Sequence, residues 1–207
     1  VDLLEKEELS NETAEGYLEV LERQSNRLKK LIEDLIEASK ASTGNLAVHL
    51  EKLEAGVSVV QIVGEFEDKL NAADLTLLIQ KPETPVYVMA DGRHFWRVID
   101  NLMNNICKYA QPGTRVYVDL RENGGQVELI FRNTSRYPLN ISSEELMERF
   151  VRGDESRNTE GSGLGISIAK SLMELMGGSF MLYVDGDLFK VVLGFAQMEE
   201  EKKPLDE

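Results

Sequence analysis

The sequence predicts an α+β protein, a two-layer α/β sandwich preceded by a long helical segment. The stretch before residue 44 has apolar residues at helical spacing. After it, short apolar segments typical of strands alternate with amphipathic helical segments, and glycine- or proline-containing turns separate them. With 42% hydrophobic and 29% charged residues, the chain can bury a core and keep a soluble surface. Mixed strands with helices on one side form two layers.

The composition argues against several classes of protein. The net charge of −14 disfavours a nucleic-acid-binding surface, because affinity for phosphate backbones depends on lysine and arginine. Cys107 is the single cysteine, which leaves no disulfide framework and no thiolate metal site. No apolar run approaches the roughly 18 residues of a membrane span, and no signal peptide is visible. We expect a cytoplasmic fragment without direct membrane contact, cut from a longer protein that can be membrane-anchored.

The first helical segment comprises residues 1–43. Residues 1–9 read as the end of one helix, 10–12 as a polar turn, and 13–42 as a second helix that stops before Gly44. Leucines and isoleucines recur along it at three-and-four spacing: Leu18, Leu21, Leu28, Leu31, Ile32, Leu35 and Ile36. A helix with such a stripe and no domain of its own needs a partner helix. A coiled-coil linker is the simplest interpretation.

Residues 44–198 form the predicted sandwich, and residues 199–207 a charged tail. Apolar alternation predicts a strand at 46–53. Helical spacing then predicts one helix over about 57–72, with four residues facing inward: Val60, Val63, Phe66 and Leu70. Two strands at 75–79 and 86–89 precede a helix from about 92 to 110, and two more at 114–120 and 126–132 form a hairpin around a glycine-rich turn. Strands at 179–184 and 188–195 complete the sheet.

A glycine-rich loop leads into the last helix of the sandwich. Gly161, Gly163 and Gly165 stand at alternate positions before an apolar-periodic segment that stops at Gly177. Such a loop leaves backbone N–H groups free and aims the positive end of the helix dipole at them. The pattern predicts a phosphate-binding loop; the alternative is a tight turn before a surface helix.

A second motif lies about sixty residues upstream, on the helix at 92–110. Asn101, Asn105 and Lys108 fall at i, i+4 and i+7, so they project from one face. Asparagine prefers caps and turns to helix interiors, so this enrichment needs a reason. Amide oxygens suit Mg²⁺ whose other ligands are phosphates and waters, and a neighbouring ammonium suits the phosphates themselves.

Together these motifs resemble the ATP-binding domain of sensor histidine kinases of two-component systems, the fold of the histidine kinase, gyrase and Hsp90 type. Residues 101–109 are similar to the family's N box, and residues 161–165 to its second glycine box. Between them, residues 148–157 resemble the F-box segment of the ATP lid, with Phe150 as its anchor. The order, spacing and flanks of the three motifs match.

The resemblance implies ATP and Mg²⁺ as cofactors. It implies that Asn105 binds the metal and that Asn101, Lys108 and Arg152 are catalytic. The residues that it places around the nucleotide are Asn105, Lys108, Tyr109, Asn133, Arg152, Arg157, Gly161, Ser162, Gly163, Leu164 and Gly165. In related ATP-hydrolysing proteins the position of Asn101 is a glutamate that acts as a general base. An amide cannot take a proton from water, which favours phosphoryl transfer to a partner over hydrolysis.

The sequence departs from the family's pattern in two places. Where the first glycine box has an aspartate that accepts the adenine amino proton, this chain has Asn133, and no glycine follows in residues 134–138. An amide oxygen accepts the same hydrogen bond more weakly. The family's phosphoacceptor histidine is also missing, because His49 and His94 both lack H-box surroundings. We therefore expect the acceptor outside this fragment, which alone would not autophosphorylate.

The implied function is the catalytic portion of a protein-histidine kinase, which passes the γ-phosphoryl of ATP to a histidine for relay to a response regulator receiver domain. The resemblance makes residues 13–42 the second helix of a dimerisation hairpin, so the chain is expected to form a homodimer. Two alternatives remain open. One is a degenerate module for dimerisation or signalling that binds nucleotide weakly or not at all. The other is a serine kinase of the same fold.

Overall fold

A computed structural model of the chain describes residues 11–44, 46–139, 146 and 163–198. The predictions for residues 1–10, for the lid and for the tail lie outside these residues. The elements are α1 (Asn11–Ser42), β1 (Glu51–Glu54), α2 (Ala55–Gly64), α3 (Glu67–Ala72), β2 (Leu75–Gln80), β3 (Tyr87–Ala90), α4 (Gly92–Tyr109), β4 (Thr114–Asn123), β5 (Gln126–Thr134), α6 (Gly165–Leu175), β6 (Ser179–Asp185) and β7 (Leu188–Met198). Within the described ranges, no helix combines the length and apolar character that a membrane crossing requires.

The strands form one seven-stranded sheet in the order β1-β3-β7-β5-β4-β2, with β6 also paired to β7. β2 runs parallel to β4, and the other pairs are antiparallel. The predicted hairpin β4–β5 is confirmed, and its turn consists of Gly124 and Gly125 with φ of +60° and +82°. Positive φ at both positions is the requirement of a tight two-residue hairpin turn, which glycine meets without steric cost.

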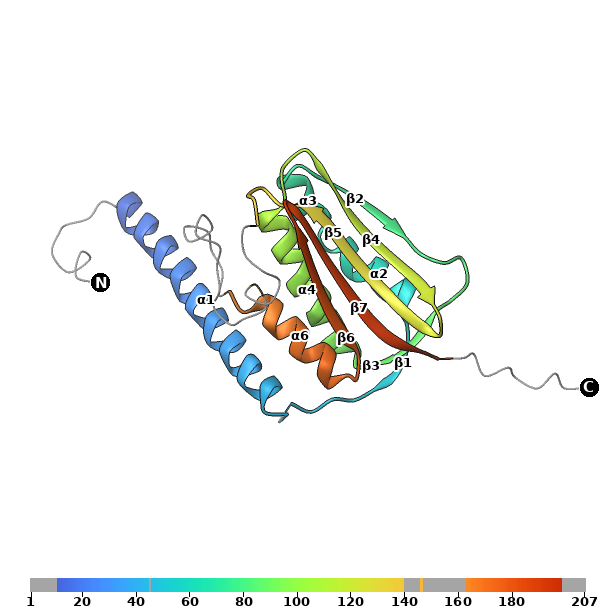
Figure 1. Cartoon of the computed structure of the whole chain (residues 1–207). Helices are drawn as coiled ribbons and strands as arrows, with labels where there is room; N and C mark the ends of the chain where they lie inside the picture. Colours follow the sequence, from blue (N-terminus) through green and yellow to red (C-terminus); the bar gives the residue numbers. More distant parts are fainter. Residues whose placement is uncertain (1–10, 45, 140–145, 147–162, 199–207) are drawn as a thin grey trace, which may run out of the picture.

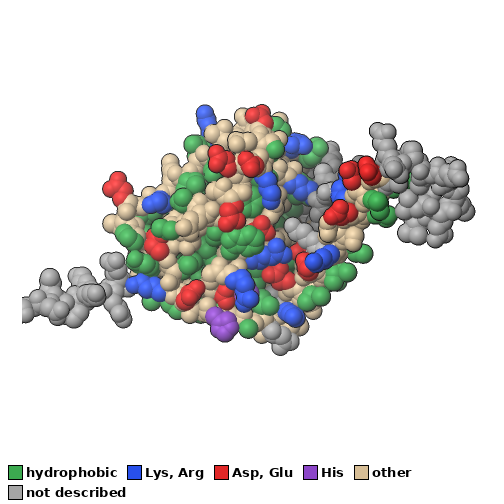
Figure 2. Space-filling view, turned by 180° about the vertical axis from the view of Figure 1, so that it is seen from behind, with side chains coloured by type: hydrophobic (Ala, Val, Ile, Leu, Met, Phe, Trp, Pro, Cys, Tyr) green, Lys and Arg blue, Asp and Glu red, His purple; other side chains and the backbone are tan. Residues whose placement is uncertain are grey.

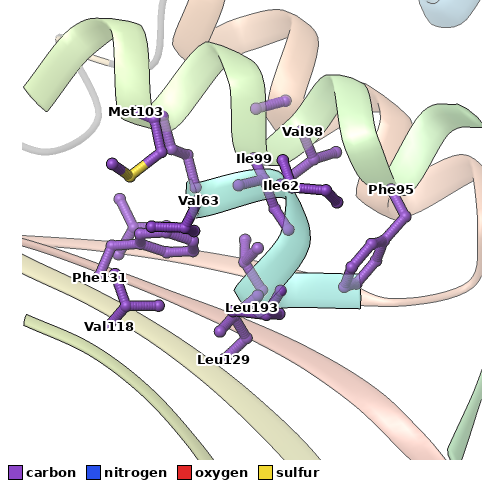
Figure 3. Close-up of a cluster of buried hydrophobic side chains, with 14 of the residues drawn as sticks. Ile62, Val63, Phe95, Val98, Ile99, Met103, Val118, Leu129, Phe131 and Leu193 are labelled. Carbon is purple, nitrogen blue, oxygen red and sulfur yellow. The ribbon is translucent and has the colours of Figure 1, made fainter. Parts of the chain in front are cut away.

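One face of the sheet is covered by helices, and the core lies between the two layers (Figure 1). α4 and α6 pack against each other on this face, while α2 contacts α4. Figure 3 shows Val98, Ile99 and Met103 of α4 pointing toward Phe131 and Leu129 of β5 and Leu193 of β7. These six side chains are completely buried. The predicted two-layer α/β sandwich is therefore confirmed.

The strand predicted at 46–53 is wrong over most of its length, because only β1 at its end pairs with another strand. Residues 46–50 instead run along the start of α4. The His49 N–H donates to Asp91 Oδ2 (2.9 Å), and His94 Nε2 lies 3.0 Å from the Ala47 carbonyl oxygen. The alternation of residues 46–50 reflects Leu46 and Val48 packing on the core, without a partner strand.

The single helix predicted at 57–72 is also wrong, since α2 ends at Gly64 and α3 begins at Glu67. Val63, Phe66 and Leu70 face inward as predicted, but Val60 is exposed and Val59 is buried in its place. The break at Glu65 and Phe66 follows Gly64, which has a low helix propensity.

α1 stands at the outer side of α6, and its N-terminal half extends beyond the sandwich (Figure 1). It begins two residues before the predicted start. Its apolar stripe is exposed at Leu18, Leu21, Leu28, Ile32, Leu35 and Ile36. The space-filling view from the other side shows acidic and basic side chains interspersed, with hydrophobic side chains between them (Figure 2).

Candidate functional site

The rotation of α4 about its own axis determines which of its side chains face the candidate site. Asp91 caps the helix, because its Oδ1 accepts hydrogen bonds from the N–H groups of Arg93 (3.0 Å) and His94 (3.1 Å). A neighbouring face of the helix buries Val98, Leu102 and Ile106 in the core. This anchoring leaves Asn101, Asn105 and Lys108 half-buried on an adjacent face, as the sequence spacing predicts. Asn105 makes no side-chain hydrogen bond to the residues that the structure describes.

The end of the glycine-rich loop lies directly against this face of α4. Gly163 has a φ of +72°, a backbone conformation that favours glycine. Leu164 is buried, and a Cβ added to Gly165 would stand 3.3 Å from Asn101 Oδ1. A side chain at Gly165 would therefore press on the Asn101 amide, so glycine permits the close approach of the loop to α4.

The residue at the N-cap position of α6 provides no side-chain cap. Leu164 occupies the N-cap position and makes no side-chain cap hydrogen bond, while its carbonyl oxygen accepts from Ser167 Oγ (2.9 Å). Leucine has no side-chain acceptor of the kind that usually satisfies one of the first N–H groups of a helix, so such an acceptor would have to come from another group. A helix start of this kind beside the amide of Asn101 fits an anionic group such as a phosphate.

Asn133 lies at the end of β5, beside the C-terminal end of α4. The Arg136 N–H donates to the Tyr109 carbonyl oxygen (2.8 Å), and the Gln111 N–H donates to the Thr134 carbonyl oxygen (2.9 Å). These bonds hold the C-terminal end of α4, with Lys108 and Tyr109, beside the end of β5. Three neighbouring chain segments therefore carry the described residues of the site. α4 carries Asn101, Asn105, Lys108 and Tyr109, the end of β5 carries Asn133, and Gly163–Gly165 lie at the start of α6.

Two amide groups of this site have buried atoms without a partner. Asn133 is 4% exposed and donates its Nδ2 to the Thr134 carbonyl oxygen (3.2 Å), while its Oδ1 has no hydrogen-bond partner in the described part of the chain. The Nδ2 of Asn101 is likewise buried and without a partner among these residues. Buried polar atoms are usually satisfied, so this acceptor and this donor are suited to a partner from outside the described residues, such as a ligand.

Lys108 places its Nζ 4.7 Å from the centre of the Tyr109 ring. This cation–π contact holds the ammonium near the C-terminal end of α4, where it is available to an anion. The remaining predicted residues Arg152, Arg157, Gly161 and Ser162 lie outside the described residues, as does Phe150. Their roles therefore stay predictions.

Asn104, a third asparagine in the segment 101–109 beside Asn101 and Asn105, does not belong to the site. Its Nδ2 donates to the backbone oxygen (2.8 Å) and to Oδ1 (2.7 Å) of Asp100, and its Oδ1 accepts from Lys69 Nζ (3.0 Å). All three bonds are structural, so part of the asparagine enrichment has a structural cause.

The sequence reasoning missed a cluster of ionic side chains around Arg97. Arg97 donates from Nη2 to Asp34 (2.7 Å), from Nε to Glu37 (2.9 Å) and from Nη1 to Asp100 (3.2 Å). Burial opposes the charge of the guanidinium, but attraction to Glu37, Asp34 and Asp100 outweighs it and raises the pKa of Arg97. Nothing in the spacing along α4 identifies Asp34 and Glu37 as partners, because they lie on α1.

The described residues fit a magnesium nucleotide by their chemistry. They offer a neutral amide oxygen for a hard cation, a lysine and the first N–H groups of α6 for phosphates, and a buried acceptor for an exocyclic amine. Within the described ranges, no three His, Cys, Asp or Glu side chains are grouped as they would be in a metal site of their own. A metal here would depend on amide and phosphate oxygens.

A sequence profile described as "Histidine kinase-, DNA gyrase B-, and HSP90-like ATPase" matches residues 90–200. The sensor protein IrlS of Burkholderia pseudomallei is 27% identical over 173 residues, which are 81% of this chain and 36% of that protein. The sensor protein kinase WalK of Staphylococcus aureus is 26% identical over 172 residues, or 81% of this chain and 41% of that protein. The chain therefore spans about two fifths or less of these relatives.

Solved structures share the fold. The Acinetobacter baumannii histidine kinase AdeS is 20% identical, with a TM-score of 0.73 over 88% of this chain and 84% of that chain. Full-length ShkA in complex with AMPPNP is 18% identical, with a TM-score of 0.77 over 96% of this chain and 42% of that chain. Histidine kinase ThkA in complex with the response regulator protein TrrA is 15% identical, with a TM-score of 0.68 over 96% of this chain and 55% of that chain.

Proposed function

This chain belongs to the histidine kinase-, DNA gyrase B- and HSP90-like ATPase family, and we propose that it is the ATP-binding catalytic portion of a sensor histidine kinase. It would transfer the γ-phosphoryl of ATP to a histidine outside this fragment, for relay to a response regulator. The observation that carries the proposal is the meeting of Asn101 on α4 with Gly165 at the start of α6. A complex of the similar protein ThkA with a response regulator supports the relay.

Each described residue of the site has a role in this proposal. Asn105 would offer its amide oxygen to Mg²⁺, and Lys108 with the N–H groups after Leu164 would bind phosphate oxygens. The buried Oδ1 of Asn133 accepts a hydrogen bond from the adenine amino group. When bound, ATP supplies the phosphoryl group, and Mg²⁺ neutralises charge on its phosphates. Tyr109 packs beside the base or the lid.

Asn101 favours transfer over hydrolysis. Its side chain is an amide, so it cannot act as a general base toward water. Its buried Nδ2 has no partner among the described residues and is free to donate to the nucleotide. We therefore assign Asn101 to holding the nucleotide for transfer. Arg152 and Arg157 stabilise the transferring phosphoryl group in this proposal, as arginines do in other phosphoryl-transfer sites.

The proposal divides the chain into a dimerisation segment at 1–43, a catalytic domain at 44–198 and a charged tail at 199–207. The exposed stripe of α1 supports a homodimer through the N-terminal helices, because large apolar patches on a surface usually mark an interface. The receiver domain of a response regulator is the second proposed partner. The proposed location of the fragment is the cytoplasm.

Calorimetry with an ATP analogue tests nucleotide binding. Titration of the chain with Mg²⁺ and a non-hydrolysable ATP analogue is expected to give saturable heat. Asn105→Ala should weaken binding by at least about tenfold, because it removes the proposed metal ligand. Asn71→Ala removes an amide from an exposed position on α3 and serves as the control. Absence of heat at millimolar nucleotide, or equal affinity of the Asn105→Ala variant and the wild type, would contradict the proposal.

A transfer assay distinguishes the acceptor. The chain is mixed with labelled ATP and a separate helical-hairpin fragment that carries an H-box histidine. Acid-labile, base-stable phosphate on that fragment is expected from a histidine kinase. Acid-stable phosphate on a serine would support the serine-kinase alternative, and binding of nucleotide without transfer to any acceptor would contradict the catalytic proposal.

A further inference from the structure

The surroundings of the Asn133 amide favour one of its two orientations. Its Nδ2 donates to the Thr134 carbonyl oxygen (3.2 Å), and this oxygen is fixed in place because it also accepts from the Gln111 N–H (2.9 Å). If the amide turned by 180°, its Oδ1 would face the same oxygen, and two acceptors would meet without a proton between them. The donor side of the amide is therefore directed to Thr134, and the buried Oδ1 is the atom that remains for another partner.

Three successive backbone N–H groups after β5 are engaged elsewhere. The Ser135 N–H donates to the Asp187 carbonyl oxygen in the turn between β6 and β7 (2.6 Å). The Arg136 N–H donates to the Tyr109 carbonyl oxygen at the end of α4 (2.8 Å). The Tyr137 N–H donates to Ser135 Oγ (3.4 Å). These bonds direct the three donors away from the side chain at the end of β5.

An amide therefore fits position 133 better than a carboxylate would. A carboxylate has acceptors only, so one of its oxygens would face the Thr134 carbonyl oxygen and gain no bond from the three engaged N–H groups. Its charge would also be buried at a higher cost than a neutral amide. Asn133 instead spends its donor on Thr134 and keeps its acceptor. The departure from the family's aspartate thus matches the groups around this position.

We propose that Thr134, through its carbonyl oxygen, is a positioning residue that makes the base site of this chain depend on an amide. The inference rests on the proposed function and deepens it, because it assigns the groups that set the choice of base. The amino group at position 6 of a purine donates to the Asn133 Oδ1. An oxo group at position 6, as in inosine, places a second acceptor against this oxygen. Turning the amide to serve the oxo group would break its bond to Thr134, so the oxo purine is disfavoured in both orientations.

Calorimetry with two nucleotides tests the orientation of the amide. The whole chain is titrated, with Mg²⁺, against the non-hydrolysable imido analogues of ATP and of inosine triphosphate, whose bases differ at position 6. The wild type is expected to bind the ATP analogue at least about tenfold more tightly, because the oxo base leaves a buried acceptor unpaired. Asn133→Ala should bring this ratio of affinities close to one. An amide with a merely structural role would change both affinities by the same factor and leave the ratio unchanged.

The substitution Asn133→Asp tests the dependence on an amide. Although it restores the residue of the family's pattern, it should weaken binding of the ATP analogue by about tenfold, because the carboxylate meets the Thr134 carbonyl oxygen. Asn71→Asp makes the same chemical change at an exposed position on α3 and should leave the affinity unchanged. Circular dichroism establishes that each variant is folded. If Asn133→Asp fails to fold, the ratios of the wild type and of Asn133→Ala still decide.

Two kinds of failure are distinguishable. Equal affinity of the wild type for both analogues, an unchanged ratio in Asn133→Ala, or tighter binding of the ATP analogue by Asn133→Asp would overturn the inference and leave the proposed function standing. Absence of heat with both analogues would overturn the proposed function and the inference with it.

Discussion

The helices α4 and α1 have similar amphipathic patterns but different surroundings. In α4, Val98, Leu102 and Ile106 are 0%, 0% and 1% exposed, since the sheet covers them. In α1, Leu28, Ile32 and Leu35 are 58%, 49% and 48% exposed. α1 contacts the sandwich through another face, which packs beside α6, buries Ala38 and carries the ion pairs of Asp34 and Glu37 with Arg97. The difference teaches that apolar periodicity shows that a helix needs a partner, while the location of this partner depends on the rest of the fold.

The largest expected effect concerns stability. Leu102→Ala should lower the free energy of unfolding of the sandwich by about 3 kcal/mol, because it leaves a cavity in a close-packed core. Leu28→Ala makes the same change on α1 and should alter that free energy by less than about 0.5 kcal/mol. Urea denaturation followed by circular dichroism measures both. Equal losses would mean that α1 and the sandwich fold as one unit, and the comparison would fail.

The next effect concerns association. Ile32→Gln should raise the dissociation constant of the dimer by about tenfold or more, because it places a polar group in the stripe that we propose as the interface. Glu33→Gln, at the next position and exposed, is the control and should change the dissociation constant little. Sedimentation velocity over a range of concentrations measures both. A wild-type chain that stays monomeric at high concentration would show that the exposed stripe has another purpose.

The smallest effect concerns Asp91, which caps the start of α4 and also accepts a hydrogen bond from His49 in the segment 46–50. Burial raises the pKa of Asp91, but N–H bonds from His49, His94 and Arg93 and the nearby His94 ring outweigh it, so this pKa lies below the ordinary 3.8. The carboxylate thus stabilises the fold above its ordinary pKa, and this stability is lost as the pH falls through the lowered pKa. Asp91→Ala should cost about 1 kcal/mol at pH 7.

That difference between the wild type and Asp91→Ala should shrink as the pH is lowered below 3.8, because the protonated wild-type side chain caps the helix less well. Urea denaturation at pH 7 and near pH 3 measures it. Asp187→Ala, which changes an exposed turn carboxylate, should show no comparable pH-dependent difference. A constant loss for Asp91→Ala at both pH values would mean that the charge of the cap is unimportant.

Much of the fold could be predicted because local patterns decide it. The period of apolar residues predicted α4, α6 and the strands of the hairpin, and Gly124 and Gly125 marked the turn between them. The errors came where a local pattern has more than one structural outcome. Alternation at 46–50 corresponds to a linker that packs on the core, and a continuous helical period at 57–72 conceals the break after Gly64.

For the site, sequence spacing predicted that Asn101, Asn105 and Lys108 share a face and that a glycine loop opens α6. It could not distinguish Asn104, whose amide is satisfied, from Asn101 and Asn133, which keep buried atoms without partners in the described part of the chain. All three are asparagines, so residue type does not separate them. Hydrogen-bond satisfaction depends on which groups approach from other elements, and spacing within one helix carries no such information.

The amino-acid sequence alone thus determined the elements, the residue types of the site and their common face on α4, because neighbours along a helix or strand have fixed relative directions. Only the tertiary structure decided that the start of α6 touches Asn101 and that Arg97 holds Asp34 on α1, 63 positions away in the chain. Contacts between distant segments follow from the packing of whole layers around one core, which no local pattern encodes.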